Sequence, residues 1–447
     1  MATAVESPPA PPARGGLPDG PGAPRTVQTA QWLSRPIEFL ERGRGRYGNA
    51  FTVRFIGVGE MIVMSEPEAL KKLFGQDREN LMPEGRTLLL EPVMGAKSIL
   101  LQEGAEHLRR RRLMLPPFHG ERMKAYEALI REIAEAEVAS WPEGEPFLLH
   151  PRMQSVTLEV IMRAVFGITD PGRLERLREL LPQMLKMTES GRSQVIGLAT
   201  RRLGAFGPWR RFQRLLDRID EVLAAEIADR RADPDLDSRQ DILSLLVAAR
   251  FEDGEAMGDS ELRDQLMTLL LAGHETTATG LAWTFDLLFR NRPAMERLTA
   301  ELQAGDGPYL DAVIEESLRL RPVVPFTGRK LVSPTTLGGW ELPPGAVVMA
   351  SIYLAHTSPD AYPEPYSFRP ERFLDTKTDT FSWIPFGGGV RRCLGAAFAL
   401  MEMRVVLRSV LTSVQLRGDR TEPEPIARRN ITFSPKHRTP AVVEQRL

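Results

Sequence analysis

The residue with the most distinctive chemistry in this sequence is Cys393, the only cysteine among 447 residues. It follows the three glycines Gly387 to Gly389, which permit positive φ and let bare backbone approach another group closely. The apolar run from Leu394 to Leu411 has helical spacing, so Cys393 is expected where a helix begins. The helix dipole and free N–H groups there favour a thiolate, which serves as a nucleophile or as a ligand to a soft metal.

The residues around Cys393 favour the metal-ligand role. A nucleophilic cysteine needs a base, and no histidine lies near it in the sequence. A ligand needs backbone donors to the sulfur, an apolar shield and positive charge for an anionic cofactor, and Gly387 to Gly389, Phe386 and Arg391 supply these. Such surroundings suit a haem iron held by cysteine. A lone cysteine is more often a small core residue, so this interpretation depends on further motifs.

A second motif lies in a long apolar segment at about 260–291. Ser260 is a suitable N-cap for a helix of about thirty residues there. A helix so long and apolar must be largely buried, yet its centre contains the stretch 272–277, Ala-Gly-His-Glu-Thr-Thr. Hydroxyls that bond back to carbonyls one turn earlier would explain Thr277 or Thr279 alone. They do not explain glycine, acid and threonine together.

These motifs, in this order, resemble those of the cytochrome P450 superfamily. Five residues match its haem-binding loop: Phe386, Gly389, Arg391, Cys393 and Gly395. The stretch 272–277 matches its oxygen-activation motif, and the resemblance runs from about Gly43 to near the C-terminus. It implies a mainly α fold with a small β-sheet subdomain (α+β), as one large domain with a long central helix over the haem.

The resemblance also implies roles for individual residues around haem b (iron protoporphyrin IX). Cys393 would ligate the iron, Thr276 would hydrogen-bond the bound oxygen, and Glu275 would relay protons from solvent. Small residues at 272 and 273 would make room for dioxygen. The other residues expected to hold the haem are His107, Arg111, Arg329, Phe386, Gly389, Arg391, Gly395, Ala272 and Gly273.

Two further residue sets follow from the same resemblance. Glu316, Arg319 and Arg372 are expected to form a buried network behind the haem loop. The expected substrate pocket is apolar, which fits fatty acids, terpenoids, steroids or macrolides equally. Its predicted residues are Leu88, Leu89, Leu90, Thr268, Leu271, Val324 and Phe326.

The main functional hypothesis is a haem-thiolate monooxygenase that uses O2 to hydroxylate or epoxidise an apolar small molecule. The chain has no glycine-rich dinucleotide fingerprint and no room for a flavin domain. Electrons are therefore expected from a separate ferredoxin or flavodoxin with its NAD(P)H reductase. That partner would dock where Arg109, Arg110, Arg112 and Arg392 face outward. The alternatives are a peroxide-driven peroxygenase and a haem sensor or carrier, which have less use for Glu275 and Thr276.

Composition limits the other classes of function. A net charge of −1 argues against binding nucleic acid through bulk charge. A single cysteine excludes an intramolecular disulfide and fits a reducing compartment. No apolar run reaches about 18 residues, and no secretory signal pattern is visible. We therefore expect a soluble, cytoplasmic protein with no transmembrane segment. Within the family that the sequence resembles, this points to a bacterial type, and we expect a monomer.

The chain is expected to contain one domain, 26–447, after a disordered leader at 1–25 that is rich in proline, glycine and alanine. A strand pair is predicted at 51–56 and 61–65. The apolar segment 82–100 lacks a steady period and is predicted to be a loop, which by the resemblance would cover the substrate. The segment 191–207 is predicted to be a mobile lid. Helices are predicted at about 66–74, 119–140, 152–167, 172–189, 207–232, 241–251 and 309–320.

Overall fold

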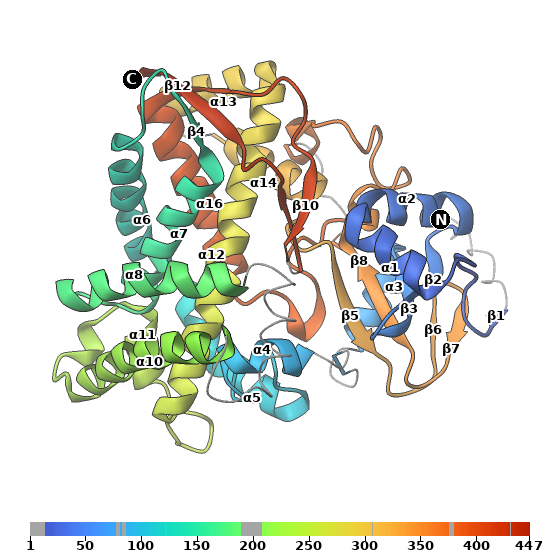
Figure 1. Cartoon of the computed structure of the whole chain (residues 1–447), viewed down its shortest axis with the longest axis horizontal. Helices are drawn as coiled ribbons and strands as arrows, with labels where there is room; N and C mark the ends of the chain where they lie inside the picture. The colour runs from blue at the N-terminus through green and yellow to red at the C-terminus, as the bar shows by residue number, and fades with distance from the viewer. Residues whose placement is uncertain are drawn as a thin grey trace, which may run out of the picture. The chain divides into compact units, whose positions relative to one another are not determined.

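The computed structural model describes residues 14–76, 81–82, 86–120, 122–188, 208–305, 307–374, 380–429 and 431–447. Helices predominate in this part of the chain, with four small sheets. The chain divides into two compact units, which are described separately (Figure 1). The smaller comprises 1–83, 326–363 and 379–391, and the larger comprises 84–325, 364–378 and 392–447.

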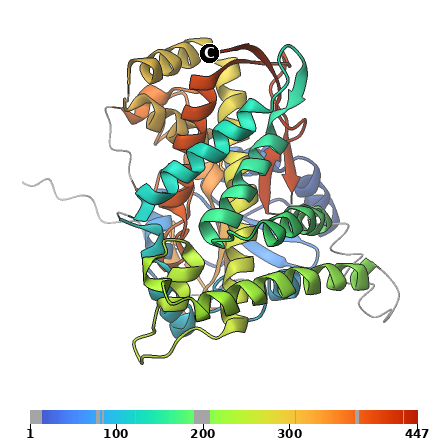
Figure 2. The same ribbon diagram turned by 90° about the vertical axis from the view of Figure 1, so that its left-hand side faces the viewer.

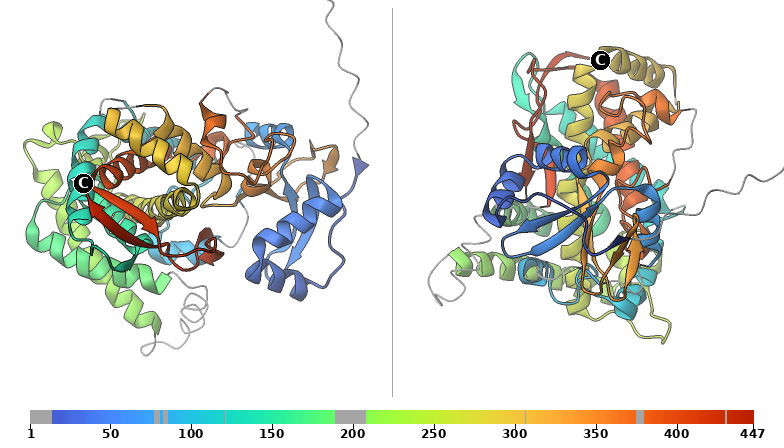
Figure 3. Two further views of the ribbon diagram at one scale, coloured as in Figure 1. Left: turned by 90° about the horizontal axis from the view of Figure 1, so that it is seen from above. Right: turned by 90° about the vertical axis from the view of Figure 1, so that its right-hand side faces the viewer.

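The smaller unit contains a four-stranded sheet in the order β2-β3-β8-β5. Strands β2 (Ala50–Phe55) and β3 (Gly59–Met64) form the predicted antiparallel pair. Gly57 and Gly59 have φ of 77° and 90° in the turn, which explains the glycines there. Strand β8 (Val347–Ser351) runs parallel to β3 and antiparallel to β5 (Phe326–Lys330). Figure 3 shows the blue N-terminal strands beside the orange ones.

The core of the smaller unit lies between this sheet and helix α3 (Pro67–Gly75). Leu70, Leu73 and Phe74 recur at helical spacing and are buried against Ile62 and Val348. The remaining elements of this unit are β1 (Arg14–Gly15), α1 (Arg25–Ser34), α2 (Pro36–Tyr47), β6 (Thr335–Leu337), β7 (Trp340–Leu342) and α15 (Ile352–His356). Residues 1–13 of the predicted leader lie outside the described residues, whereas β1 pairs in parallel with β7.

The larger unit is organised around α12 (Asp259–Arg290), a helix of 32 residues. Helix α7 (Leu149–Val160) and helix α16 (Ala396–Ser413) pack against it (Figures 1 and 2). Every residue of α12 from Thr277 to Leu288 is buried, as its apolar composition predicted.

The other elements of the larger unit surround these three helices. Its helices are α4 (Arg86–Met94), α5 (Gly104–Met114), α6 (Arg122–Ala139), α8 (Pro171–Thr188), α10 (Pro208–Ala232), α11 (Ile242–Ala248), α13 (Arg292–Ala304) and α14 (Tyr309–Leu320). Its strands are β4 (Pro146–Leu148), β9 (Val414–Gly418), β10 (Ile426–Arg429), β11 (Thr432–Pro435) and β12 (Pro440–Arg446).

Close contacts fix α16 on α12. A Cβ on Gly280 would lie 3.3 Å from the Met403 side chain, so glycine there allows the two helices to approach. Beside it, the buried Glu402 side chain hydrogen-bonds Thr277, and burial raises the pKa of Glu402 to about 8. Among the described residues, Glu402 Oε1 has no hydrogen-bond partner. Because α16 begins shortly after Cys393, this packing also positions the cysteine relative to α12.

The predicted network of Glu316, Arg319 and Arg372 is present. Arg319 donates to both carboxylate oxygens of Glu316, at 2.6 and 2.8 Å. Arg372 Nε donates to the same carboxylate at 3.1 Å, as does the backbone N–H of Arg369 at 2.8 Å. The Arg319 and Glu316 side chains are 0% exposed. Arg319 also donates to the Pro365 carbonyl at 2.7 Å, so the buried charges are well satisfied.

Three predictions about local structure were wrong or inexact. The segment 82–100 is not wholly a loop, because α4 occupies Arg86–Met94 with Pro92 inside it; the sequence there has no steady helical period, so its spacing gave no signal of a helix. Helix α12 begins at Asp259, and Gly258 rather than Ser260 is its N-cap. Helix α7 begins at Leu149 and continues as a π-helical turn over Ile161–Val165. The predicted lid at 191–207 lies outside the described residues.

The buried carboxylate of Glu316 yields a stability prediction. Glu316→Gln should lower the free energy of unfolding by about 3 kcal/mol, because two arginines would lose the charge that compensates them in the interior. Urea unfolding monitored by circular dichroism measures this. The matched control is Glu296→Gln, whose pair with Arg292 is exposed, and its effect should stay under about 0.5 kcal/mol. Equal effects of the two substitutions would contradict the network's structural importance.

Glu402 yields a prediction about pH. The pKa of this carboxyl is raised in the folded protein from 4.5 to about 8, so between these values the unfolded chain releases a proton that the native state retains. The contribution of Glu402 to the free energy of unfolding should therefore be largest below pH 4.5 and decline as the pH rises toward about 8. Glu402→Gln should flatten this decline, whereas Glu422→Gln, at an exposed position, should leave it unchanged. An unaltered slope in Glu402→Gln would show that Glu402 does not titrate in this way.

Candidate active site

Cys393 is exposed to solvent, yet burial by the surrounding protein raises the pKa of its thiol. The residue as a whole is thus accessible to solvent, although many protein atoms lie around its sulfur. The Gly395 N–H bonds the sulfur, and the charges of Arg111 and Arg392 partly offset the rise. The predicted lowering of this pKa is therefore wrong for the polypeptide itself. The reason is that α16 begins only at Ala396, with Gly395 as its N-cap, and desolvation outweighs its field.

Helix α5 carries His107 and Arg111 one turn apart. His107 is buried, and Arg111 is half-buried. Burial lowers the pKa of the Arg111 guanidinium, and the nearby Cys393 opposes that shift. Among the described residues, no carboxylate forms an ion pair with Arg111. A desolvated cation of this kind beside the cysteine suits an anionic group of a cofactor.

The other arginines of α5 are paired with acids. Arg110 is 7% exposed and contacts Glu261 at 2.7 Å. Arg109 binds Asp253 at 2.6 Å and stacks over a phenylalanine ring, and Arg112 binds an acid of the same loop at 2.6 Å. The prediction that Arg110 faces outward to dock a redox partner is therefore wrong, because the acids of the 252–261 segment and of α5 itself hold these charges.

The centre of α12 differs from its flanks. Ala272 is exposed and Leu271, Gly273, Glu275 and Thr276 are half-buried, although the helix is buried on either side. A Cβ on Gly273 would lie 3.3 Å from Ile161 in the π-helical turn after α7. The centre of this helix thus presents small and polar residues at an accessible surface.

The two polar side chains at this centre have defined partners. Thr276 Oγ1 donates to the Ala272 carbonyl at 2.6 Å, the back-bond expected of a helical threonine. Glu275 accepts a hydrogen bond from Gln154 Nε2 at 2.6 Å and one from Thr279 at 3.3 Å. The sequence analysis missed Gln154 and its neighbour His150. Their spacing of four residues, which places both on one face of the helix, was the available signal.

The predicted pocket residues have mixed surroundings. Thr268 is buried, and its hydroxyl lies 2.6 Å from both the Ser98 hydroxyl and the Asp264 carbonyl. Leu90, Leu271 and Val324 are half-buried in the larger unit. Leu88 and Leu89 lie in α4, but their side chains are outside the described part of the structure. Phe326 belongs to the smaller unit, where it packs edge-on against Trp32.

The remaining predicted cofactor residues lie in the smaller unit. Gly387 and Gly389 have φ of 68°, as the glycine run predicted. A Cβ on Gly388 would lie 2.5 Å from the Phe74 ring, so the backbone there needs glycine. Arg329 is buried and donates to Thr327 Oγ1 at 3.0 Å. The other two, Phe386 and Arg391, are half-buried.

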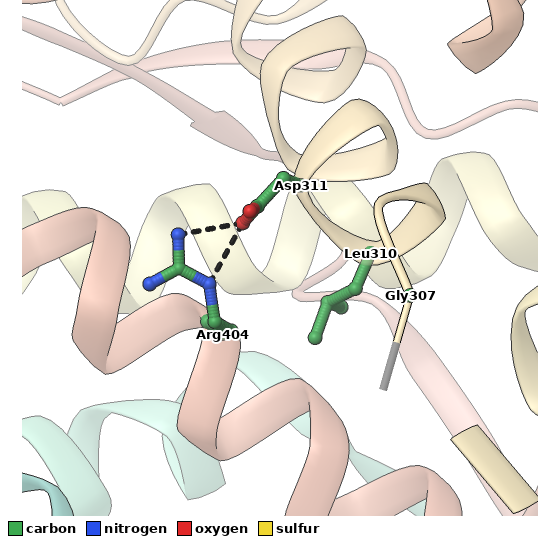
Figure 4. A pocket seen from close by; sticks show the side chains of 4 residues that line it. All are labelled: Gly307, Leu310, Asp311 and Arg404. Atoms are coloured by element: carbon green, nitrogen blue, oxygen red, sulfur yellow. Dashed lines mark hydrogen bonds and ion pairs between the residues drawn. The ribbon is translucent and has the colours of Figure 1, made fainter. Parts of the chain in front are cut away.

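A surface cavity of about 300 Å³ lies elsewhere in the larger unit (Figure 4). It is lined by Gly307, Leu310, Asp311 and Arg404. Asp311 and Arg404 form an ion pair at 2.6 Å across it. None of the predicted site residues lines this cavity, and its shallow ion-paired wall offers no catalytic group.

Three features of the larger unit fit a cysteine-ligated haem. Cys393 is exposed, Arg111 supplies a desolvated positive charge near it, and the small residue Ala272 is exposed at the centre of a buried helix. Thiolate ligation and a cation for the propionates are the donor set that such a cofactor needs.

Comparison with known proteins supports the same conclusion. The family model described as Cytochrome P450 matches residues 18–441. The chain is 42% identical to cytochrome P450 135B1 of Mycobacterium tuberculosis over 92% of this chain and 87% of the relative. It is 39% identical to cytochrome P450 137 of the same species over 98% of this chain and 93% of that protein.

Solved structures agree in fold. The cyanobacterial CYP120A1 bound to retinoic acid has a TM-score of 0.82 at 25% identity, covering 97% of this chain and all of that one. The heme domain of cytochrome P450DA has a TM-score of 0.83 at 21% identity, covering 98% of this chain and 99% of that one. No helix in the described part of the chain has the length and hydropathy to span a membrane. The chain belongs to the cytochrome P450 family of haem monooxygenases.

Proposed function

We propose that this chain hydroxylates or epoxidises an apolar small molecule with O2, taking electrons from a separate ferredoxin or flavodoxin. Residues 26–447 would act as the catalytic domain. The observation that carries the proposal is the combination, in one compact unit, of an exposed Cys393 with a half-buried acid and threonine at the centre of α12. A haem carrier or sensor would have no use for Glu275 and Thr276 at that centre.

We assign the cofactor as haem b, with Cys393 as its protein ligand. His107, Arg111, Arg329 and Arg391 are the proposed propionate-binding residues. When bound, this group supplies dioxygen binding and reductive O–O cleavage, which amino-acid side chains cannot perform. The small residues proposed to lie against it are Ala272, Gly273, Gly389 and Gly395, with Phe386 as apolar cover.

The thiol of Cys393 holds its proton in the polypeptide, because burial raises its pKa. Ligation of a metal by Cys393 would require the loss of that proton, which a positive charge at the sulfur would favour. Arg111 and Arg392 reduce its cost, since both charges favour the thiolate. These two arginines would thus favour the thiolate form of Cys393 before a cofactor binds.

Thr276 and Glu275 would have separate roles in proton transfer. The Thr276 hydroxyl donates its proton to the Ala272 carbonyl, so its oxygen remains an acceptor for a second hydroxyl group. The Thr276 hydroxyl can therefore accept a hydrogen bond from a protonated oxygen without donating its own proton. Glu275 is half-buried and therefore reachable by water, which suits a carboxylate that collects protons from solvent.

The substrate is proposed to be apolar. Leu90, Leu271 and Val324 are aliphatic and half-buried, and the similar protein CYP120A1 binds retinoic acid, a largely hydrocarbon molecule. The hydroxyl of Thr268 is engaged by Ser98. We therefore propose that Thr268 holds the chain segment before α5 rather than contacting substrate.

Substitution of Thr276 tests the proposed function. A substrate is first identified by the spin-state shift it induces in the ferric protein, and turnover is then driven by ferredoxin and its reductase. Thr276→Ala should reduce product per NADPH at least about tenfold and release peroxide instead, because the acceptor hydroxyl is lost. Thr276→Ser should restore coupling. Thr284→Ala removes another back-bonded helical hydroxyl and should leave coupling unchanged; full coupling in Thr276→Ala would contradict the assignment.

Substitution of Arg111 tests the cofactor assignment. Arg111→Leu should speed the transfer of haem to apomyoglobin about tenfold, since one charged hydrogen bond contributes roughly 1.5 kcal/mol or more. Arg112→Leu is the matched control, because its side chain is 65% exposed and paired with Glu252. If both variants release haem at the wild-type rate, Arg111 does not bind a propionate.

A further inference from the structure

Helix α7 presents a polar stripe to α12. His150, Gln154 and Thr157 recur at one-turn spacing and so share one face of α7. Opposite them, on α12, stand His274, Glu275 and Thr279. Hydrogen bonds pair the two sets: Gln154 with Glu275 at 2.6 Å, His150 with Thr279 at 3.2 Å, and Thr157 with His274 at 2.9 Å.

The chemistry of these groups fixes the direction of the hydrogen bonds around Glu275. An ionised carboxylate can only accept, and a hydroxyl has one proton to donate. Thr279 Oγ1 therefore donates to Glu275 Oε1 at 3.3 Å. Its oxygen must then accept from His150 Nε2, which places the imidazole proton on that nitrogen. The bare nitrogen is then His150 Nδ1, the buried ring atom that has no hydrogen-bond partner among the described residues.

The surroundings keep His150 neutral. Its side chain is 0% exposed, and burial, followed by the charges of Arg429 and Arg438 and by His274, lowers its pKa to about 3. The titratable group facing it from α12 is Glu275, with Oε1 at 3.7 Å from Nε2. His150 therefore acts on Glu275 through the Thr279 hydroxyl rather than as a cation.

Gln154 and Thr279 are neutral donors as well. Neutral donors hold a carboxylate in a defined orientation without an opposite charge that would stabilise its ionised form against protonation. Such an arrangement orients an acid that must still exchange protons. We propose that Gln154 and the His150–Thr279 pair are positioning residues that set the orientation of the Glu275 carboxylate for proton transfer at the centre of α12. This inference rests on the role of Glu275 in the proposed function.

The first test measures the orientation without turnover. Infrared difference spectra of the haem-loaded ferric protein identify the Glu275 carboxylate band as the one lost in Glu275→Gln. Gln154→Leu should shift that band, because it removes the donor to Oε2. The matched control is Gln183→Leu, an exposed glutamine on α8 that bonds its own helix at the Glu179 carbonyl. A band unmoved by Gln154→Leu would overturn the proposal.

The second test separates positioning from the proposed function. O2 consumption is driven by ferredoxin and its reductase without substrate, in H2O and in D2O. Glu275→Gln should slow it about tenfold and enlarge the isotope effect, and Gln154→Leu should move both quantities in the same direction by about threefold. If only Glu275→Gln has an effect, the positioning proposal fails while the role of Glu275 survives. If Glu275→Gln itself has no effect, the proposed role of Glu275 fails, and the positioning proposal with it.

A third measurement needs no altered contact at Glu275. Nitrogen NMR of histidine-labelled ferrous protein with carbon monoxide distinguishes the two imidazole tautomers, and the His150 resonance is the one lost in His150→Gln. We expect the Nε2–H tautomer at neutral pH. An Nδ1–H tautomer or a charged imidazolium would overturn the donor order from His150 through Thr279 to Glu275.

Discussion

The packing of α12 between α7 and α16 is the constraint on which the rest of the larger unit depends. Past Thr276 the helix is buried for three turns, and Gly280 lets Met403 approach it closely. Glu402 adds a buried hydrogen bond to Thr277. Because a packed interior resists displacement, the centre of α12 and the start of α16 are held in a fixed relation. The accessible centre of the helix can then present small and polar groups without losing its own order.

The same interior sets the electrostatics of the site. Burial opposes charge on Cys393 and Arg111 alike, yet each group favours the charged form of the other. The polypeptide thus holds a thiol rather than a thiolate, and Arg111 would favour the thiolate form that metal ligation requires. His150 and His274 are likewise kept neutral by burial, with pKa values of about 3 and about 4. Because both imidazoles are uncharged, Glu275 is the proton-carrying group among these three residues.

Much of this architecture could be predicted from the sequence. Helix α14 spans the predicted residues, Tyr309–Leu320, and the pair of Glu316 and Arg319 that the resemblance implied is present. The glycines at 387 and 389 do adopt positive φ. Local spacing and backbone freedom are properties of a short segment, so a sequence reveals them directly.

The failures share a different cause. Arg110 was expected on the surface, but acids distant in sequence pair with it. The Cys393 thiol was expected to have a lowered pKa, but surrounding protein desolvates it. The partners of Glu275 on α7 lie more than a hundred residues away. Burial and long-range pairing depend on how helices meet, which no local pattern encodes.

The most direct test of the account concerns the bond between Cys393 and the haem iron. The purified protein is reduced with dithionite, carbon monoxide is added, and the absorption spectrum is recorded. The account predicts the strongly red-shifted Soret band of a thiolate-ligated haem, lost in Cys393→His. A protein without haem, or one whose Soret band is that of imidazole-ligated iron, would contradict it.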